Sequence, residues 1–328
     1  MRAGQFDPKV LELDCAAETL RIGRWLVEHV KRLGRRGVVV AISGGVDSSV
    51  CAALAARAFG RPRVLGLLLP ERDSSSASTT LGRQVASQLN IDYLVEDIAP
   101  TLETIGCYRR RDAAIRKMFP EYGPAWKSKI VIASSMGGKL HYFKLVVQAP
   151  QGEIQEVRLP LKEYLEIVAA TSFKQRIRKT LEYFHADRLN YAVIGTPNRL
   201  EYDQGFFVKN GDGSADVKPI AHLYKTQVYA LARYLEIPEE ICKARPTTDT
   251  YSMAQGQDEF YFALPHEKMD LALWAHDHSV AATELAPHIG LSAEETQIVY
   301  ADIKSKRRTT AYLHAAPALV EAVFEISA

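Results

Sequence analysis

The stretch VVVAISGGVDSSV, residues 38–50, constrains the fold of this chain more than any other. Its apolar start does not alternate with polar residues, which predicts a strand covered on both faces, as in a parallel sheet. Two glycines separate this strand from a helix-forming run at 48–59, so the loop can present backbone N–H groups and a helix N-terminus to an anion. The pattern is that of a phosphate-binding loop, but the loop carries an acid, Asp47, and no lysine.

The segments on both sides of this loop alternate between helix and strand patterns. An amphipathic helix is predicted at 11–33 and ends at Gly34. Further strands are predicted at 63–69 and 91–98, with a helix at 78–89 between them. Apolar strands that alternate with helices predict a doubly wound α/β fold, with a mostly parallel sheet flanked by helices.

The alternation breaks over about 106–170. This part carries a basic run, an apolar run at 129–135, and alternating residues on both sides of 149–153, which predict a β-hairpin. We interpret 106–170 as an insertion in a single domain that spans 1–328. The remaining predicted elements are a helix at 172–188, a strand at 191–196, a helix at 222–236 and a helical C-terminal tail over 267–305.

Charge balance and cysteine content limit the class of protein. Lys plus Arg (41) nearly equal Asp plus Glu (39), and we interpret the basic runs at 108–117 and 304–309 as solvated helix faces. Four cysteines without a C-x-x-C pair or metal-ligand spacing are typical of a reducing compartment. There is no signal-peptide pattern and no bilayer-length apolar stretch. We therefore expect a cytoplasmic protein that binds neither nucleic acid nor a membrane.

Asp47 is the residue of the loop that most needs a chemical explanation. A carboxylate beside phosphates repels them unless a cation lies between, so we expect Asp47 to bind Mg²⁺ that bridges to the phosphates. The hydroxyls of Ser43, Ser48 and Ser49 can donate further hydrogen bonds. The alternative is a turn whose Asp and Ser side chains cap the helix and bind no ligand. The strand–loop–helix context favours phosphate binding.

The sequence SGGVDSS resembles the loop of the N-type ATP pyrophosphatases, which cleave ATP between the α and β phosphates. The resemblance implies an adenine nucleotide alpha hydrolase-like fold. It also implies that the loop holds a pyrophosphate leaving group, whose charge is met by backbone, hydroxyls, a metal and a lysine from elsewhere in the chain. A Ser–His–Asp interpretation of the loop serines therefore has little support.

A second block, residues 193–228, is similar to the ammonia-dependent NAD synthetases. The segments PTTD (246–249) and DE (258–259) match that family as well. The resemblance covers nearly all of the chain outside 106–170, and two ordered blocks are more specific than the loop alone. The matching residues of the second block are Gly195-Thr196, Glu201, Gly205-Phe206-Phe207, Lys209, Gly211-Asp212-Gly213, Asp216, Pro219 and Leu223 to Gln227.

The resemblance implies roles for individual residues. Asp47 and Glu201 would hold Mg²⁺ as two hard carboxylate ligands, and Asp47 and Lys225 would be the catalytic residues. Taken singly, each residue has a structural explanation, such as a helix cap or a surface charge; together, the ordered match favours function. The residues implied to bind ATP are Ser43, Gly44, Gly45, Val46, Asp47, Ser48, Ser49, Thr196, Lys225 and Thr247, and those implied to bind the dinucleotide acceptor are Arg176, Lys209, Asp216 and Lys306.

The implied activity is the ATP-dependent amidation of deamido-NAD to NAD⁺. The acceptor carboxylate would attack the α-phosphate, giving an acyl-adenylate and Mg²⁺-pyrophosphate, and ammonia would then displace AMP. Mg²⁺ and Lys225 would neutralise the charge that grows on the pyrophosphate. The family also implies a homodimer with the dinucleotide at the subunit interface. No glutaminase region is visible, so the ammonia would be free or come from a separate glutaminase.

Three departures from the family pattern fall near the acceptor side. Ser172 stands where the family has Asn, Ser305-Lys306-Arg307 replaces His-Lys-Arg, and 106–170 is longer than the family's connection. They leave open the same adenylating amide-ligase chemistry on a different carboxylic acid. A non-catalytic nucleotide-binding module is a third hypothesis, disfavoured by the presence of both carboxylates and Lys225. The insertion could reshape the acceptor pocket, bind another phosphate-bearing acid, extend a subunit interface or decorate the surface.

Overall fold

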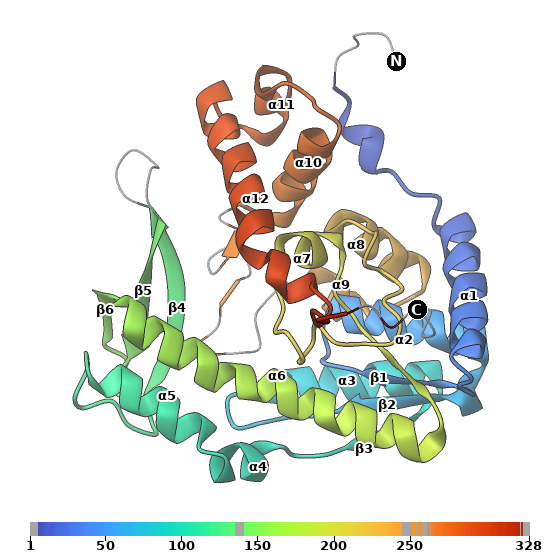
Figure 1. Cartoon of the computed structure of the whole chain (residues 1–328), viewed down its shortest axis with the longest axis horizontal. Helices are drawn as coiled ribbons and strands as arrows, with labels where there is room; N and C mark the ends of the chain where they lie inside the picture. Colours follow the sequence, from blue (N-terminus) through green and yellow to red (C-terminus); the bar gives the residue numbers. More distant parts are fainter. Residues whose placement is uncertain are drawn as a thin grey trace.

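The centre of the molecule is a four-stranded parallel sheet in the order β3-β2-β1-β7 (Figure 1). The computed structural model describes residues 6–134, 141–244, 251–253, 255–256, 261–262, 264–321 and 323. The chain order reverses at β1, because β2 and β3 lie on one side of it and β7 on the other. The strands are β1 (Val38–Ala41), β2 (Val64–Leu68), β3 (Asp92–Val95) and β7 (Ala192–Ile194).

Helices cover both faces of this sheet, as the unbroken apolar strands predict. Val38 and Val40 face one helical layer, whereas Val39 faces the other. The predicted doubly wound α/β fold is confirmed. The first layer contains α1 (Cys15–Arg32), α2 (Val46–Phe59), α3 (Ser76–Leu89), α8 (Lys225–Tyr234) and α9 (Glu239–Lys243), and the second contains α4 (Ala99–Thr104), α5 (Cys107–Arg116) and α6 (Leu161–Leu189).

Helix α6 begins eleven residues before the predicted start at 172, and this part of the prediction is wrong. Thr171 and Ser172 read as polar helix-start residues in the sequence. In the structure they lie inside the helix, where Thr171 Oγ1 donates to Ile167 O (2.9 Å) and Ser172 Oγ donates to Val168 O (2.8 Å). Hydroxyls that bond the carbonyl four residues back are compatible with a continuous helix. The helix begins directly after Pro160, because a proline disfavours the helical conformation in the residue that precedes it.

A separate antiparallel sheet, β4-β5-β6, lies beside the N-terminal end of α6 (Figure 1). The predicted hairpin is confirmed as β5 and β6. The sheet is anchored, because Ile130 and Leu145 pack with Ile115 of α5 and Ile167 of α6. Its strands are β4 (Lys127–Ser134), β5 (His141–Gln148) and β6 (Ile154–Arg158).

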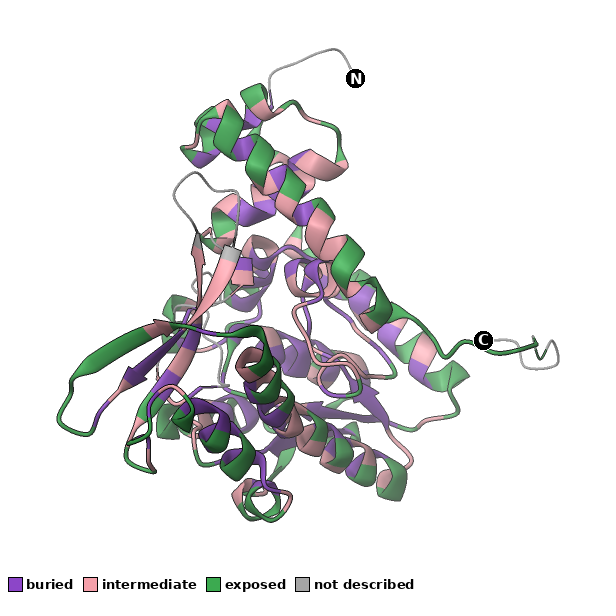
Figure 2. Cartoon of the chain, turned by 60° about the vertical axis from the view of Figure 1, so that its left-hand side comes forward, coloured by how far each residue is buried: buried purple, intermediate pink, exposed green. Residues whose placement is uncertain are grey.

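The C-terminal helices pack around their own apolar cluster, which includes Phe6, Leu273 and Ile303. Figure 2 shows the buried inner sides of these helices above the main sheet. No helix within the described residues has the length and apolarity needed to cross a membrane. The remaining elements are η1 (Pro8–Leu11), η2 (Arg61–Arg63), α7 (Arg199–Gln204), α10 (His266–Asp277), α11 (Ala282–Ile289) and α12 (Ala293–His314).

A buried ionic cluster joins α5 and α6 to the loop that follows β2. Lys174 Nζ lies 2.9 Å from Glu71 and 2.8 Å from Asp73, and Arg111 lies 2.5 Å from Asp73. Burial would raise the pKa of Asp73, but the charges of Lys174 and Arg111 outweigh it and lower that pKa to about 2. Tyr108 OH donates to Glu71 over 2.8 Å. The basic run at 108–117 is therefore only partly a solvated face, because Arg111 is 3% exposed.

We predict that Lys174→Met lowers the free energy of unfolding by about 3 kcal/mol or more, because it leaves Glu71 and Asp73 buried with one cation fewer. Urea unfolding at pH 7 measures this. The matched control is Lys144→Met, since Lys144 pairs with Glu156 on the surface. The control should cost less than about 1 kcal/mol. Equal losses in the two variants would contradict a buried structural role for the cluster.

Candidate active site

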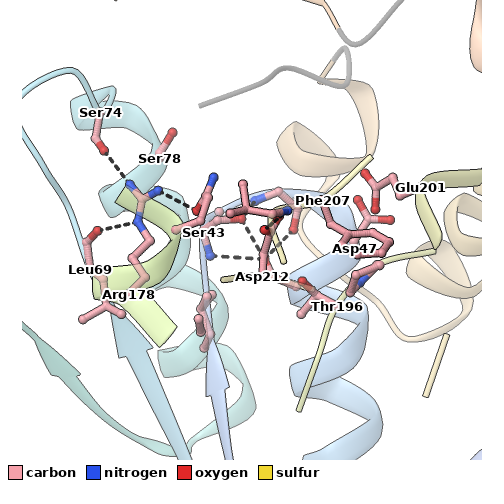
Figure 3. A pocket seen from close by; sticks show the side chains of 18 of the residues that line it. Ser43, Asp47, Leu69, Ser74, Ser78, Arg178, Thr196, Glu201, Phe207 and Asp212 are labelled. Atoms are coloured by element: carbon pink, nitrogen blue, oxygen red, sulfur yellow. Dashed lines mark hydrogen bonds between the residues drawn. The ribbon is translucent and has the colours of Figure 1, made fainter. Parts of the chain in front are cut away.

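A cavity of about 540 Å³ opens at the carboxyl ends of β1, β2 and β7. This is the point where the strand order reverses, and open α/β sheets bind ligands at such points. Its walls come from the 43–48 loop, the end of β2, α6, the 196–208 segment and Lys225 of α8. Figure 3 shows Arg178 with Ser74 on one side, Asp47 and Glu201 on the other, and Ser43 between them. The cavity therefore joins the two sequence blocks that are far apart along the chain.

The loop after β1 is shaped for close approach of a ligand to the backbone. Gly44 has φ +82°, and a Cβ there would lie 2.4 Å from Ser78 O, so only glycine fits. Ser48 Oγ accepts from Ser43 N over 3.2 Å and holds the loop closed. No side chain caps the first turn of α2, so its N–H groups remain for a ligand. Ser49 Oγ donates to Gly45 O over 2.8 Å, as Ser48 Oγ does over 3.1 Å, but Ser49 is fully buried and does not line the cavity.

Asp47 and Lys225, which both line the cavity, form a partly buried ion pair. Lys225 is 2% exposed and is the first residue of α8, where the helix dipole disfavours a cation. Burial would lower the pKa of Lys225, but the charges of Asp47 and Glu201 raise it above its ordinary value. The ammonium group is thus held in its charged form. Asp47 is held from the other side by Asn198, whose Nδ2 donates to Oδ1 over 2.9 Å.

Glu201 belongs to α7 and lies near the same point. Asn198 caps α7, and its Oδ1 accepts from Glu201 N over 3.1 Å while the Glu201 carboxylate accepts from Asn198 N. Burial raises the pKa of Cys51 most, and the charges of Asp47 and Glu201 raise it further. Both carboxylates therefore lie near Cys51 and near each other. Sequence reasoning missed Asn198, although the Asn-x-x-Glu capping box was visible. Among the described residues, no cluster of three or more His, Cys, Asp or Glu forms a metal site.

Helix α6 contributes a charged group that sequence reasoning did not assign to the cavity. Arg178, Lys179 and Glu182 line it together with Asp212. Lys179 Nζ donates to Glu182 over 2.6 Å. Arg178 Nε donates to Leu69 O over 3.2 Å and its Nη2 to Ser74 Oγ over 3.4 Å, which orients the guanidinium against the β2 loop (Figure 3). The helical spacing from Gln175 to Glu182 was the available signal, because it places these side chains on one face.

The predicted acceptor residues lie outside the cavity lining. Arg176 is exposed and its Nε donates to Lys209 O over 3.3 Å, while Lys209 Nζ donates to Tyr312 O over 2.6 Å. Asp216 accepts from Val193 N over 2.7 Å and from Tyr183 OH over 3.3 Å. Lys209 therefore contacts α6 at Arg176, and Asp216 contacts it at Tyr183. Arg176 and Tyr183 are seven residues apart on α6, so Arg176, Lys209 and Asp216 lie along one outer strip of that helix.

The other predicted residues are placed as follows. Lys306 of α12 donates to Tyr261 O over 2.7 Å and pairs with Asp302, and Tyr261 lines the cavity. Thr247 lies outside the described residues. Of the predicted ATP-binding set, the members that line the cavity are Ser43, Gly44, Gly45, Val46, Asp47, Ser48, Thr196 and Lys225, and Glu201 lines it as well.

A glycine loop, a helix N-terminus, a buried lysine and two carboxylates in one cavity can hold a polyphosphate with its counterion. No nucleophile poised for covalent catalysis is needed for such a site. The fold and the cavity therefore define an α/β protein with a nucleotide-sized cavity at the carboxyl edge of its parallel sheet.

Comparison with known proteins narrows this class to a family. The family model described as NAD synthase matches residues 18–118 and 132–311, so the chain belongs to the NAD synthase family. It is 55% identical over 322 residues to the NH(3)-dependent NAD(+) synthetase of Rhizobium meliloti (strain 1021), covering 98% of this chain and 96% of that one. It is 35% identical over 251 residues to the enzyme of the same name from Thermotoga maritima, covering 76% and 83%.

Solved structures agree on the fold. The NH3-dependent NAD synthetase from Campylobacter jejuni superposes with a TM-score of 0.62 at 24% identity, covering 94% of this chain and all of that one. An NMN synthetase from Francisella tularensis superposes with a TM-score of 0.60 at 19% identity, covering 94% and 99%. At these identities the likeness concerns the fold alone.

We predict that the stability of the fold falls as pH rises from about 4 to about 7 because of Asp270. Asp270 is fully buried and accepts from Thr226 N over 2.7 Å, next to Lys225. Burial raises its pKa to about 7. A carboxyl whose folded pKa is raised stabilises the fold at low pH, and this contribution is lost between pH 4 and 7.

Asp270→Asn keeps the acceptor oxygen and removes the titration. Its unfolding free energy relative to the wild type should therefore grow by about 3 kcal/mol between pH 5 and pH 8. Urea unfolding at the two pH values measures the difference. A difference that is the same at both would mean that Asp270 does not titrate in this range.

Proposed function

We infer that this chain catalyses the ATP-dependent amidation of deamido-NAD to NAD⁺ with ammonia as the nitrogen donor. Near-full-length identity of 55% to an NH(3)-dependent NAD(+) synthetase carries the assignment. The partly buried pair of Asp47 and Lys225 beside the glycine loop supports it, because α–β cleavage of ATP needs a site for the leaving pyrophosphate.

The cavity residues suit the pyrophosphate. The N–H groups of the loop and of α2 would hold its oxygens, with Ser43 beside them. Lys225 would neutralise charge on the leaving group, since Asp47 and Glu201 keep its amine protonated. Thr196 at the end of β7 would close the site from the neighbouring strand. Withdrawal of electrons from the bridging oxygen makes pyrophosphate a better leaving group when the acceptor carboxylate attacks.

We propose that Asp47 and Glu201 hold Mg²⁺. Two carboxylates plus phosphate oxygens are a usual ligand set for this ion, and the site offers these two carboxylates in one neighbourhood. When bound, Mg²⁺ would supply positive charge to the phosphates. Lys225 and Asn198 hold the Asp47 carboxylate in place, so the ligand is oriented in advance.

The acceptor side extends from the cavity to the outer strip of α6. We propose that Arg176, Lys209 and Asp216 bind a part of deamido-NAD that projects beyond the cavity, and that Lys306 acts next to Tyr261. The strip is exposed, and Phe184 beside it is 57% exposed, which supports a homodimer that covers it. The four free cysteines support a cytoplasmic location.

We predict that the purified protein, given ATP, Mg²⁺, ammonium and nicotinic acid adenine dinucleotide, forms NAD⁺ and AMP in equal amounts. Chromatography of both products measures the ratio. Omission of Mg²⁺ with chelator should abolish both. AMP that forms only with a different carboxylic acid would overturn the acceptor, and ADP in place of AMP would overturn the site of cleavage.

We predict that Lys225→Met lowers kcat at least about 100-fold, because it removes charge stabilisation of the leaving group. The matched control is Lys243→Met, which makes the same substitution at a lysine that pairs with Glu239 on the surface. The control should retain wild-type kcat.

Glu201→Gln should raise the Mg²⁺ concentration needed for half-maximal rate, whereas an unchanged requirement would contradict metal ligation by Glu201.

A further inference from the structure

The cavity is long because it follows one face of α6. Tyr164, Val168, Gln175, Arg178 and Glu182 all line it, at spacings of three to seven residues that place them on one side of a helix. At about 1.5 Å per residue, the stretch from Tyr164 to Glu182 is about 27 Å long. The N-terminal part of this wall belongs to residues 161–170, within the segment that the sequence sets apart.

The two ends of this wall differ in chemistry. The Arg178 end is charged, with Lys179 and Glu182 beside it. The opposite end is aromatic: Phe143 of β5 and Tyr164 of α6 stack with ring centroids 4.1 Å apart and planes 13° apart, and both line the cavity. Both side chains come from 106–170, so this segment supplies part of the wall.

Two further aromatic side chains line the same cavity from other segments. Phe206 and Tyr261 have ring centroids 4.9 Å apart. Burial raises the pKa of Tyr261, and the nearby Asp302 and Tyr164 raise it further, which places the Tyr164 hydroxyl in the same neighbourhood. Aromatic rings from β5, α6 and two loops thus gather at one end of the cavity.

The stacked pair lies between the core of its segment and the cavity, because Phe143 and Tyr164 pack against that core and also line the cavity. The adjacent inward residues Leu145 and Ile167 are each 1% exposed and fill the core of this segment. Phe143 and Tyr164 are only half-buried and stand at the cavity wall. A flat apolar surface at the wall of a nucleotide-sized cavity is suited to a planar ring, because aromatic groups gain most from offset stacking.

We propose that Phe143 and Tyr164 form a stacking subsite for a flat heteroaromatic ring of a bound nucleotide substrate. The identity of the substrates rests on the proposed function. ATP offers adenine, and deamido-NAD offers adenine and a pyridine ring, so the shared chemistry is a planar nitrogen heterocycle. The subsite makes 106–170 a determinant of substrate affinity.

Phe143→Leu tests the subsite, because it keeps an apolar side chain and removes the ring. The KM for one substrate should rise about 5- to 150-fold, the range expected for loss of one stacked base, with a smaller change in kcat. Phe143→Tyr keeps the ring and should restore the KM. The control is Tyr142→Leu on the same strand: Tyr142 points to the opposite face, where Arg158 lies 5.2 Å from its ring.

The two substrates are varied separately. A rise in the KM for ATP identifies adenine of ATP as the stacked ring, and a rise in that for nicotinic acid adenine dinucleotide identifies a ring of the acceptor. Inhibition by nicotinic acid mononucleotide, which lacks adenine, then tells pyridine from adenine. Unchanged KM values for both substrates, or equal effects in Tyr142→Leu, would overturn the proposal.

Two further measurements separate the possible failures. Tyr164→Leu reaches the same subsite from α6, so it substitutes for Phe143→Leu if that variant unfolds at assay temperature. An inactive wild type would overturn the proposed function instead. In that case, ATP and nicotinic acid adenine dinucleotide are titrated separately into wild type and Phe143→Leu in a calorimeter. The subsite is supported if the variant binds one of the two ligands more weakly than the wild type does, and overturned if it binds both equally well.

Discussion

The partly buried ion pair between Asp47 and Lys225 is the interaction on which the arrangement of this site depends. A lysine that is 2% exposed at a helix N-terminus is stable only where carboxylates neutralise it. Asp47 does so from the first turn of α2, and Asn198 connects Asp47 to the helix that bears Glu201. Three helix starts are thereby fixed around one point. The same charges that stabilise the apoprotein are those that a polyphosphate and its cation would use.

Helix α6 connects this site to the loop after β2 and to α5. Its inner face lines the cavity. Lys174 forms ion pairs with Glu71 and Asp73 of the loop after β2. Arg178 donates hydrogen bonds to the same loop from the cavity side. The loop is held between two cations four residues apart on the helix. Because α5 joins the cluster through Arg111, the segment after residue 106 is coupled to the cavity wall by buried charge.

The parallel sheet, the hairpin and the glycine turn between β1 and α2 could be predicted because local residue patterns specify them. The start of α6 could not, since Thr171 and Ser172 look like helix-start residues until their hydroxyls are seen to bond back to the helix. Nor could Arg178 be chosen over Arg176. The two lie on different faces of one helix, and only the packed position of α6 decides which one faces the cavity.

The three departures from the family pattern converge in space, although they are far apart in sequence. Ser172 lines the cavity on α6, and Lys306 donates to the backbone of Tyr261, which lines it too. The segment 106–170 contributes Phe143 and Tyr164, and Tyr164 is close enough to Tyr261 to raise its pKa. Changes at one end of a shared cavity alter packing together, because neighbouring side chains are energetically coupled. The phosphate loop at the other end keeps the family's residues, so the chemistry of ATP and the fit of a substrate ring can vary independently.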